Sequence, residues 1–329
     1  MKIRASQGTA LKLNRLKGRL AVEPTTLYLM TYHAGKCSAN CGFCSQARSS
    51  YSKGDKLSRV VWPLFELEEL FKEYDERKFN SIRRVCIQTI NYKGVFEDLV
   101  KIINYLKNKT SLPISVSIKP LGREEILILH GLGVDKICFP VDAATKELFE
   151  HIKGEYTGGP YRFENHLSAL SEAVEVFGKF NVTTHLILGL GETEGEAANF
   201  MLKMKSLGVY VGLFALTPVK GTPSENFKPP RMESYRRVQL LRFLIFEEDA
   251  SGRLLSFDEL GELKGINIPQ AQLSRLVDSG SPFLTSGCPG CNRPFYNERI
   301  SGPIYNYPSA VMVKNDINII KSDLRGLIK

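Results

Sequence analysis

The stretch Cys37-Ser38-Ala39-Asn40-Cys41-Gly42-Phe43-Cys44 places three cysteines within one short loop, directly after a strand-like segment at residues 26–31. A [4Fe-4S] cluster normally takes four cysteine ligands, so three thiolates hold three irons and leave the fourth iron open to another ligand. A structural zinc site is the alternative, but it needs four closed ligands, usually in C-x2-C pairs. The spacing therefore predicts an iron–sulfur cluster with one open iron.

Strand-like and helical segments alternate along the chain after this loop. Strands are predicted, with that first one, over residues 26–31, 84–88, 114–118, 136–139, 183–188 and 210–216. Helices are predicted between them over residues 64–74, 95–106, 123–130, 161–177 and 194–207. Such connections give parallel strands, and no dinucleotide-binding glycine fingerprint follows the first strand. We therefore favour an α/β fold, a partial (β/α)6 barrel of the TIM type, over an open doubly wound sheet.

Three parts are expected along the chain. Residues 1–25 form an amphipathic helical segment, because the leucines at 13, 16 and 20 share one helical face over residues 9–22. Residues 26–250 form the barrel. Residues 251–329 lose the alternation and form a carboxy-terminal extension with a C-x2-C pair, which we expect to fold over the barrel mouth.

Composition excludes several classes of protein. Hydrophobic residues make up 43% of the 329 residues, which excludes a disordered chain. No apolar stretch approaches the 18 residues of a membrane span, and no signal peptide follows the charged start, so a cytoplasmic location is expected. The net charge of +9 favours an anionic partner.

The cysteine motif, with an aromatic residue before its last cysteine, resembles that of the radical S-adenosylmethionine (SAM) superfamily. The resemblance implies that Cys37, Cys41 and Cys44 hold a [4Fe-4S] cluster whose open iron binds SAM. An electron from the cluster then cleaves SAM to methionine and a 5′-deoxyadenosyl radical. The glycine-glycine-glutamate sequence of many members is replaced here by Cys86-Ile87-Gln88-Thr89, which leaves Gln88 as the candidate cofactor contact.

Three further motifs, between about residues 26 and 227, resemble those of biotin synthase and lipoyl synthase. By this resemblance the candidate SAM contacts are Asp142 after the fourth strand, Gly189, Gly191 and Glu192 after the fifth, and Lys220 after the sixth. Each motif also has a purely structural interpretation. The glycine turn can serve as a tight strand-to-helix connection, and Asp142 can belong to a helix cap with Thr145.

Four cysteines lie outside the first motif: Cys86, Cys138, Cys288 and Cys291. Biotin synthase holds a second, [2Fe-2S] cluster with cysteines on three strands. By that resemblance only Cys86 matches, since Ser115 and Thr183 stand at the other two positions. We therefore expect the four to hold a second, auxiliary [4Fe-4S] cluster. The alternatives are buried structural cysteines on the strands and a zinc knuckle or redox pair in the extension.

The segment Gly287-Cys288-Pro289-Gly290-Cys291-Asn292-Arg293-Pro294 resembles the tail of archaeal two-component lipoyl synthases. The resemblance predicts a sulfur transferase in which the radical removes a hydrogen atom from a protein-bound octanoyl chain and the auxiliary cluster donates sulfur. The single-chain lipoyl synthase is excluded, because its amino-terminal cysteine run and carboxy-terminal Arg-Ser-Ser-Tyr are missing.

Two alternatives stay open for the function. One is a biotin synthase-related radical SAM enzyme that acts on a small free substrate. The other is a zinc-stabilised nucleic-acid-binding protein, which the positive charge favours and the lack of a dense basic run disfavours. The lipoyl synthase interpretation implies as partners an acidic octanoylated carrier protein or domain, a second radical SAM subunit and a reductant such as ferredoxin. No membrane partner is expected.

Overall fold

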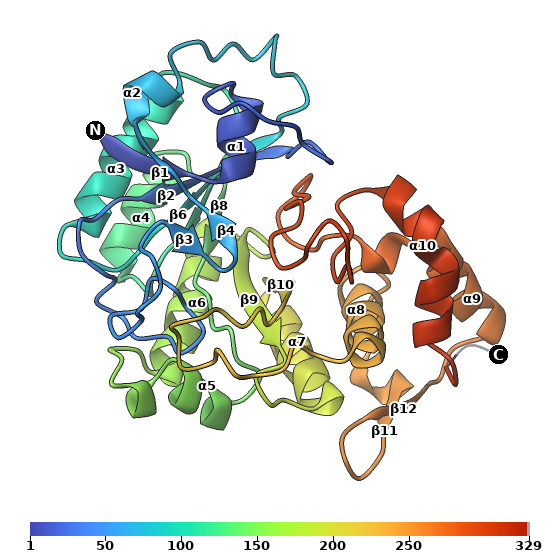
Figure 1. Ribbon diagram of the computed structural model, residues 1–329. Helices are drawn as coiled ribbons and strands as arrows, with labels where there is room; N and C mark the ends of the chain where they lie inside the picture. Colours follow the sequence, from blue (N-terminus) through green and yellow to red (C-terminus); the bar gives the residue numbers. More distant parts are fainter. Residues whose placement is uncertain (328–329) are drawn as a thin grey trace.

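The computed structural model describes residues 1–327 and is built around an eight-stranded sheet (Figure 1). The strand order is β10-β9-β8-β7-β6-β2-β1-β5, so β10 and β5 are the two free edges. Six neighbouring strands are parallel: β2 (Thr26–Thr31), β6 (Arg84–Gln88), β7 (Ile114–Ser117), β8 (Lys136–Cys138), β9 (Val182–Leu188) and β10 (Val209–Ala215). The sheet curves without closing, which confirms the partial barrel.

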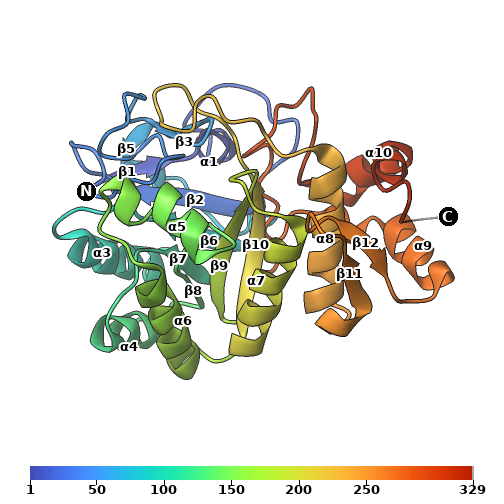
Figure 2. The same cartoon turned by 90° about the horizontal axis from the view of Figure 1, so that it is seen from below.

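Helices connect the parallel strands and cover the outer face of the sheet (Figure 2). They are α3 (Val95–Lys107), α4 (Arg123–Gly131), α5 (Lys146–Ile152), α6 (Phe163–Phe177) and α7 (Glu194–Leu207). The ends of α7 show why the sequence predicts it well. Thr193 Oγ1 accepts the Glu196 N–H, and the Glu196 carboxylate accepts the Thr193 N–H, which together form a capping box.

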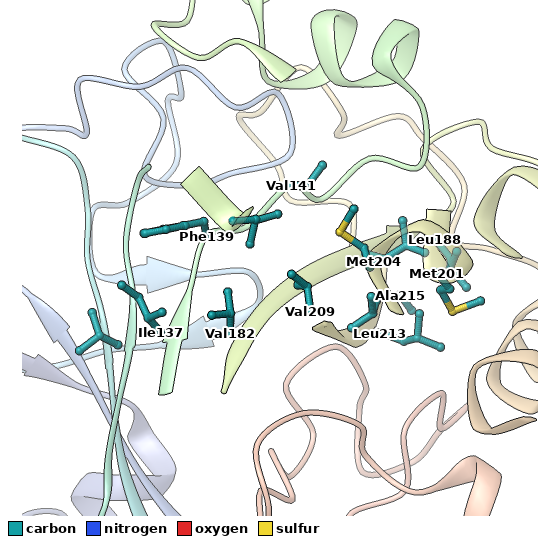
Figure 3. Close-up of a cluster of buried hydrophobic side chains, with 14 of the residues drawn as sticks. Ile137, Phe139, Val141, Val182, Leu188, Met201, Met204, Val209, Leu213 and Ala215 are labelled. Atoms are coloured by element: carbon teal, nitrogen blue, oxygen red, sulfur yellow. The ribbon is translucent and has the colours of Figure 1, made fainter. Parts of the chain in front are cut away.

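The core between the strands and α7 is apolar throughout (Figure 3). Val182, Leu213 and their neighbours on β9 and β10 are buried against Met201 and Met204 of α7. Strands buried on both faces read as continuous apolar runs, as expected for parallel strands under helices.

The first 25 residues differ from the predicted amphipathic helix. Strand β1 (Lys2–Ala5) pairs antiparallel with β2, and the helix α1 (Gln7–Lys12) ends far before residue 22. Ser6 caps α1 by accepting the Thr9 N–H, and Asn14 adopts a positive φ of 58° that turns the chain away from the helix. The prediction for residues 9–22 was therefore wrong in extent.

The predicted helix over residues 64–74 is also mostly replaced by other structure. Strand β5 (Leu64–Glu66) pairs antiparallel with β1, and only one turn, α2 (Leu67–Leu70), is helical. A short hairpin of β3 (Lys56–Leu57) and β4 (Val60–Val61) precedes it. Pairing with β1 satisfies the backbone of residues 64–66, which overrides the apolar spacing in the sequence.

The extension forms a separate layer beside α7 and β10 with α8 (Met232–Phe246), which the sequence analysis assigned to the barrel. The layer also contains a hairpin of β11 (Leu255–Phe257) and β12 (Leu263–Ile266), and the helices α9 (Gln270–Ser279) and α10 (Ala310–Asp323). The tail segment, residues 284–307, leaves this layer and runs along the open side of the barrel. Ser286 Oγ accepts the Leu213 N–H of β10, and Asn292 Oδ1 accepts the Thr25 N–H next to β2. The tail segment thus links β10 to the chain just before β2 across the open side of the barrel.

No helix within residues 1–327 combines the length and apolarity needed to cross a bilayer.

The tail segment is anchored to α8 by a buried arginine. Arg236 is 1% exposed and donates to the carbonyl oxygens of Ile304 and Tyr305, at 2.5 and 2.7 Å. Its guanidinium also lies 5.1 Å from the centre of the Tyr307 ring. A buried cation with these partners fixes where the tail segment returns to the extension.

We expect Arg236→Leu to lower the free energy of unfolding by about 3 kcal/mol, because the Ile304 carbonyl loses its donor, the Tyr305 carbonyl keeps only Gln239 and Asp323 loses its cation. Urea unfolding of the purified protein measures this loss. Arg123→Leu, at an exposed ion pair with Glu175, is the control and should cause only a small change. Equal effects of the two substitutions would contradict the proposed anchoring.

Candidate functional site

The cysteine loop, residues 37–44, leaves β2 at its carboxyl end and is held by backbone hydrogen bonds. The Cys37 N–H donates to Gln46 O at 2.9 Å, and the Gly42 N–H donates to Ile152 O at 2.7 Å. Gly42 O in turn accepts the Ser224 N–H at 3.1 Å. The loop is therefore fixed on two sides, by the end of α5 and by the loop that follows β10.

The three thiols of this loop line a cavity of about 210 Å³ at the carboxyl ends of the parallel strands. Barrel enzymes of this type carry their active sites at this end. The cavity is also lined by residues from several other strands and loops and from the tail segment, among them Gln88, Ser117, Asp142, Lys153, His185, Tyr296 and Asn297.

The surroundings of the thiols act on their charge in two opposite ways. Burial raises the pKa of all three, and that of Cys44 reaches about 11. The Lys153 ammonium opposes this effect at Cys41, and the Asn91 N–H donates to Cys37 Sγ at 3.1 Å. Positive and N–H groups stabilise thiolates, the form in which cysteine binds a metal.

The arrangement fits a cluster better than a single metal ion. Within residues 1–327, no three His, Cys, Asp or Glu side chains lie close enough together to hold one ion. A structural zinc site needs four such ligands on one ion. In a [4Fe-4S] cluster each thiolate binds a different iron, so the ligands stand further apart. Three cysteines on one loop with a buried cation beside them fit that donor set.

Asp142 lies in an irregular continuation of β8 and faces the cavity. Its N–H donates to His185 O and its carbonyl accepts the Ile187 N–H, although its φ is +70°. Its carboxylate accepts a hydrogen bond of 2.6 Å from Lys153 Nζ, and both side chains are less than 10% exposed. Thr145, and not Asp142, caps α5 by accepting the Leu148 N–H. The helix-cap interpretation of Asp142 was therefore wrong.

The buried pair leaves a cation next to the thiols. Burial by itself lowers the pKa of Lys153, but Asp142 and Cys41 raise it, and the net pKa lies above its ordinary value. Burial lowers the pKa of His185 to about 4, so this neighbour is uncharged near neutral pH. Lys153 is thus the charged group that faces the cavity from α5.

The other four cysteines meet inside the barrel. Cys86 is the central residue of β6, in register with Tyr28 and Ser115 on the neighbouring strands. Cys288 Sγ lies 3.3 Å from Ser115 Oγ, and Cys291 Sγ lies 3.2 Å from Tyr28 Oη. Burial raises the pKa of the Cys86 thiol, and the nearby Cys288, Cys291 and Cys138 raise it further. We call these four residues the second cysteine group.

The tail segment reaches this group from the end of the barrel opposite to the expected one. Gly290 O accepts a hydrogen bond from Thr25 Oγ1, just before β2, and Gly290 also lies beside Arg83, just before β6. The expectation that the C-x2-C pair folds over the mouth was therefore wrong. Its partners, Cys86 and Ser115, do not lie at the carboxyl ends of their strands, so the pair meets them from the amino-terminal end. Further along the tail segment, Tyr296 and Asn297 do reach the mouth.

A model of the radical SAM superfamily matches residues 31–204, which include the cysteine loop, most residues that line the cavity and the parallel strands β6 to β9. The chain belongs to the radical SAM superfamily. Membership implies a [4Fe-4S] cluster and SAM, and the thiols of Cys37, Cys41 and Cys44 fit the ligands of that cluster.

Curated relatives of this radical SAM protein are named biotin synthase. That of Clostridium acetobutylicum is 27% identical over 247 residues, which cover 71% of either chain. That of Thermotoga petrophila is 26% identical over 242 residues, covering 72% of this chain and 76% of the relative. The expected biotin synthase-like branch is thereby confirmed.

Solved structures with a similar fold include two enzymes or maturases of other names. Methylornithine synthase has a TM-score of 0.53 at 17% identity, covering 72% of this chain and 66% of its own. The [FeFe]-hydrogenase maturase HydG of Carboxydothermus hydrogenoformans has a TM-score of 0.54 at 17% identity, covering 82% of this chain and 59% of its own. At this identity the likeness concerns the fold alone.

Five of the six SAM contacts predicted from the sequence separate into two groups. Gln88 and Asp142 line the cavity of the thiols. Gly189, Gly191 and Glu192 instead line a separate cavity of about 320 Å³. The Glu192 carboxylate accepts the N–H groups of Gly189 and Leu190, so it closes its own turn. The structure does not bring these three residues to the thiols.

The glycine turn at residues 189–192 and the loop after β10 that carries Lys220 nevertheless both support the cysteine loop. Leu190 of the glycine turn packs in one apolar cluster with Phe43. Lys220 is exposed, and its carbonyl accepts a hydrogen bond from Ser52 Oγ. At the next residue, Gly221, an added Cβ would lie 2.8 Å from Ser52 N, which explains the glycine. Lys220 therefore contacts the chain that follows the cysteine loop and not the cavity.

Sequence reasoning missed Lys153 and Tyr296, two residues that line the radical SAM cavity. Lys153 follows the last turn of the short helix α5 and belongs to no motif. Tyr296 lies five residues after Cys291, and the C-x2-C pair was the one signal that pointed to this part of the chain.

The buried pair predicts strong coupling between its members. Lys153→Met and Asp142→Asn should each lower the free energy of unfolding by about 3 kcal/mol, because each leaves a buried polar partner unpaired. The double variant should lose clearly less than the two single losses together. Urea unfolding of the four proteins gives the coupling energy. The same cycle on the exposed pair Lys146 and Glu164 is the control, and similar coupling there would contradict the argument.

Proposed function

We propose that the protein is a sulfur-inserting radical SAM enzyme related to biotin synthase. When bound, the cluster of Cys37, Cys41 and Cys44 with SAM supplies a radical that removes hydrogen from carbon, and an auxiliary cluster on the second cysteine group supplies sulfur. The observation that carries the proposal is the gathering of four further cysteines inside the barrel, below the SAM cavity. Names of the relatives support sulfur insertion.

The chain's own residues prepare this chemistry. Gln88 and Asp142 face the cavity as contacts for SAM, and the Lys153 ammonium keeps Asp142 in place at 2.6 Å. Phe214, Tyr296 and Met30 line the cavity with apolar surface. Such walls position the reacting carbon and keep water away from a reactive radical.

Two substrate classes fit this proposal, each with its own support. The comparisons favour a small free substrate, since the relatives are named biotin synthase. The tail segment supports an octanoyl chain on an acidic carrier, because its C-x2-C sequence resembles two-component lipoyl synthases. A second radical SAM subunit and a reductant such as ferredoxin belong to the second proposal.

Replacing Cys37, Cys41 and Cys44 together by Ala should abolish formation of 5′-deoxyadenosine, because no thiolate remains to hold the cluster whose open iron would bind SAM. The measurement is chromatography of the products after anaerobic reconstitution with iron, sulfide, SAM and dithionite. Continued release of 5′-deoxyadenosine by this variant would overturn the assignment of the cluster ligands.

Replacing Cys288 and Cys291 by Ala should reduce the iron content from about eight to about four per chain, since one of two [4Fe-4S] clusters is lost. SAM cleavage should persist and the thiolated product should disappear. Iron counting and mass spectrometry of the product measure both effects. Pro289→Ala keeps both thiols and is the matched control. About four irons in the wild type and in the variant would refute the auxiliary cluster.

A further inference from the structure

The two thiols of the C-x2-C pair each lie beside a hydroxyl group of the barrel wall. Cys291 Sγ lies 3.2 Å from the hydroxyl oxygen of Tyr28 on β2, and Cys288 Sγ lies 3.3 Å from the hydroxyl oxygen of Ser115 on β7. Tyr28 and Ser115 stand at the same level of the sheet, since both are in register with Cys86 on β6. Two hydroxyl groups thus meet the two sulfurs at one level inside the barrel.

Each hydroxyl group also accepts a hydrogen bond from a nitrogen donor. The Arg293 N–H donates to Tyr28 Oη at 2.9 Å, and Arg84 Nη1 donates to Ser115 Oγ at 2.8 Å. A hydroxyl group has one proton to donate, and a backbone N–H or a guanidinium group cannot accept it. The hydroxyl proton is therefore left for the neighbouring sulfur.

The charge state of the sulfur fixes the direction of both hydrogen bonds. A cysteine binds a metal as a thiolate, which has no proton and can only accept. When the second cysteine group holds a cluster, Tyr28 and Ser115 are therefore the donors. The nitrogen donors behind them strengthen the arrangement, because hydrogen bonds in a chain polarise one another.

Both hydroxyl groups act from buried positions. Tyr28 is 7% exposed, Ser115 is 4% exposed, and Arg84, which lies behind Ser115, is 5% exposed. Arg84 is itself held by an ion pair of 2.5 Å with Asp135. Hydrogen bonds and charges act more strongly in such an environment than at the surface, where water screens them.

The cysteine loop receives a hydrogen bond of another kind. Cys37 Sγ accepts the backbone N–H of Asn91 at 3.1 Å. A backbone donor is present with almost any side chain, whereas the donors to Cys288 and Cys291 exist only because Ser115 and Tyr28 carry hydroxyl groups. Substitutions of these two residues can therefore change the surroundings of the second cysteine group alone.

We propose that Tyr28 and Ser115 are positioning residues that raise the reduction potential of the auxiliary cluster. Hydrogen bonds to the sulfur ligands draw negative charge away from a cluster and so favour its reduced form. A carbon radical brings one electron to a sulfide lone pair of two. The new C–S bond takes two of these three electrons, and the third reduces one Fe(III) to Fe(II). A higher potential favours this step. The inference rests on the proposed sulfur-inserting function and assigns the two hydroxyl groups a part in it.

The test uses full-length protein in which the three thiols of the cysteine loop are replaced by Ala, so that reconstitution with iron and sulfide loads the second cluster alone. Redox titration followed by electron paramagnetic resonance gives its midpoint potential. Ser115→Val and Ser115→Thr form the matched pair, because the two side chains have a similar shape and only Thr keeps the hydroxyl group.

We expect Ser115→Val and Tyr28→Phe each to make reduction about tenfold less favourable, because each removes one hydrogen bond to a charged sulfur. For one electron this is a downward shift of about 59 mV. Ser115→Thr should keep a potential close to that of the parent protein. Tyr51→Phe, at a position that is 96% exposed, is the control and should leave the potential unchanged.

The first cluster gives a second control. In protein that carries Cys288→Ala and Cys291→Ala, neither Ser115→Val nor Tyr28→Phe should change its potential. An equal shift there, or an unchanged potential of the second cluster in both variants, would overturn the inference and leave the sulfur-inserting function intact. Loss of the second cluster's iron from either variant would show that the hydroxyl groups hold the ligands in place, which contradicts an effect on the potential. About four irons per chain in the unmodified protein would instead overturn the proposed function, because no second cluster would then exist.

Discussion

The architecture depends on a gap that six parallel strands cannot close. A closed barrel of this type needs eight parallel strands, and here β10 is a free edge while β2 pairs on its other side with the antiparallel strand β1. The tail segment runs along this open side and contacts both β10 and the chain just before β2. Arg293 holds it there, since its N–H donates to Tyr28 Oη at 2.9 Å and its guanidinium lies 3.8 Å from the centre of the Phe214 ring. The same segment contributes Tyr296 to the cavity and two thiols to the interior, so wall and site are built by one piece of chain.

Much of the fold was predictable because local signals agree with the global packing. The six parallel strands are largely buried and rich in β-branched and apolar residues, and α7 carries its own caps, so their sequences admit few alternatives. The cysteine loop was predictable because all three thiols lie within the short stretch of residues 37–44. The amino-terminal segment was not, since β1 becomes a strand only through pairing with β2 and β5.

The site was predictable where a motif carries the side chain, and not where packing alone positions it. Asp142 follows a predicted strand and faces the cavity as expected. Glu192 follows a recognisable motif, yet its carboxylate is used by the N–H groups of its own turn. The position of Cys288 and Cys291 inside the barrel depends on contacts with Ser115 and Tyr28. These partners are far away in sequence, so no local pattern predicts the contacts.

The two groups of thiols differ in how far along the chain their members lie. The first group, Cys37, Cys41 and Cys44, is complete once the loop after β2 has been synthesised. Cys291 meets Tyr28 across 263 residues of sequence, so the second group exists only after the tail segment has been made and has docked. Bringing such distant residues together costs chain entropy that only the folded barrel offsets. The first group of thiols is therefore available early in synthesis, whereas the second forms only once the tail segment has docked.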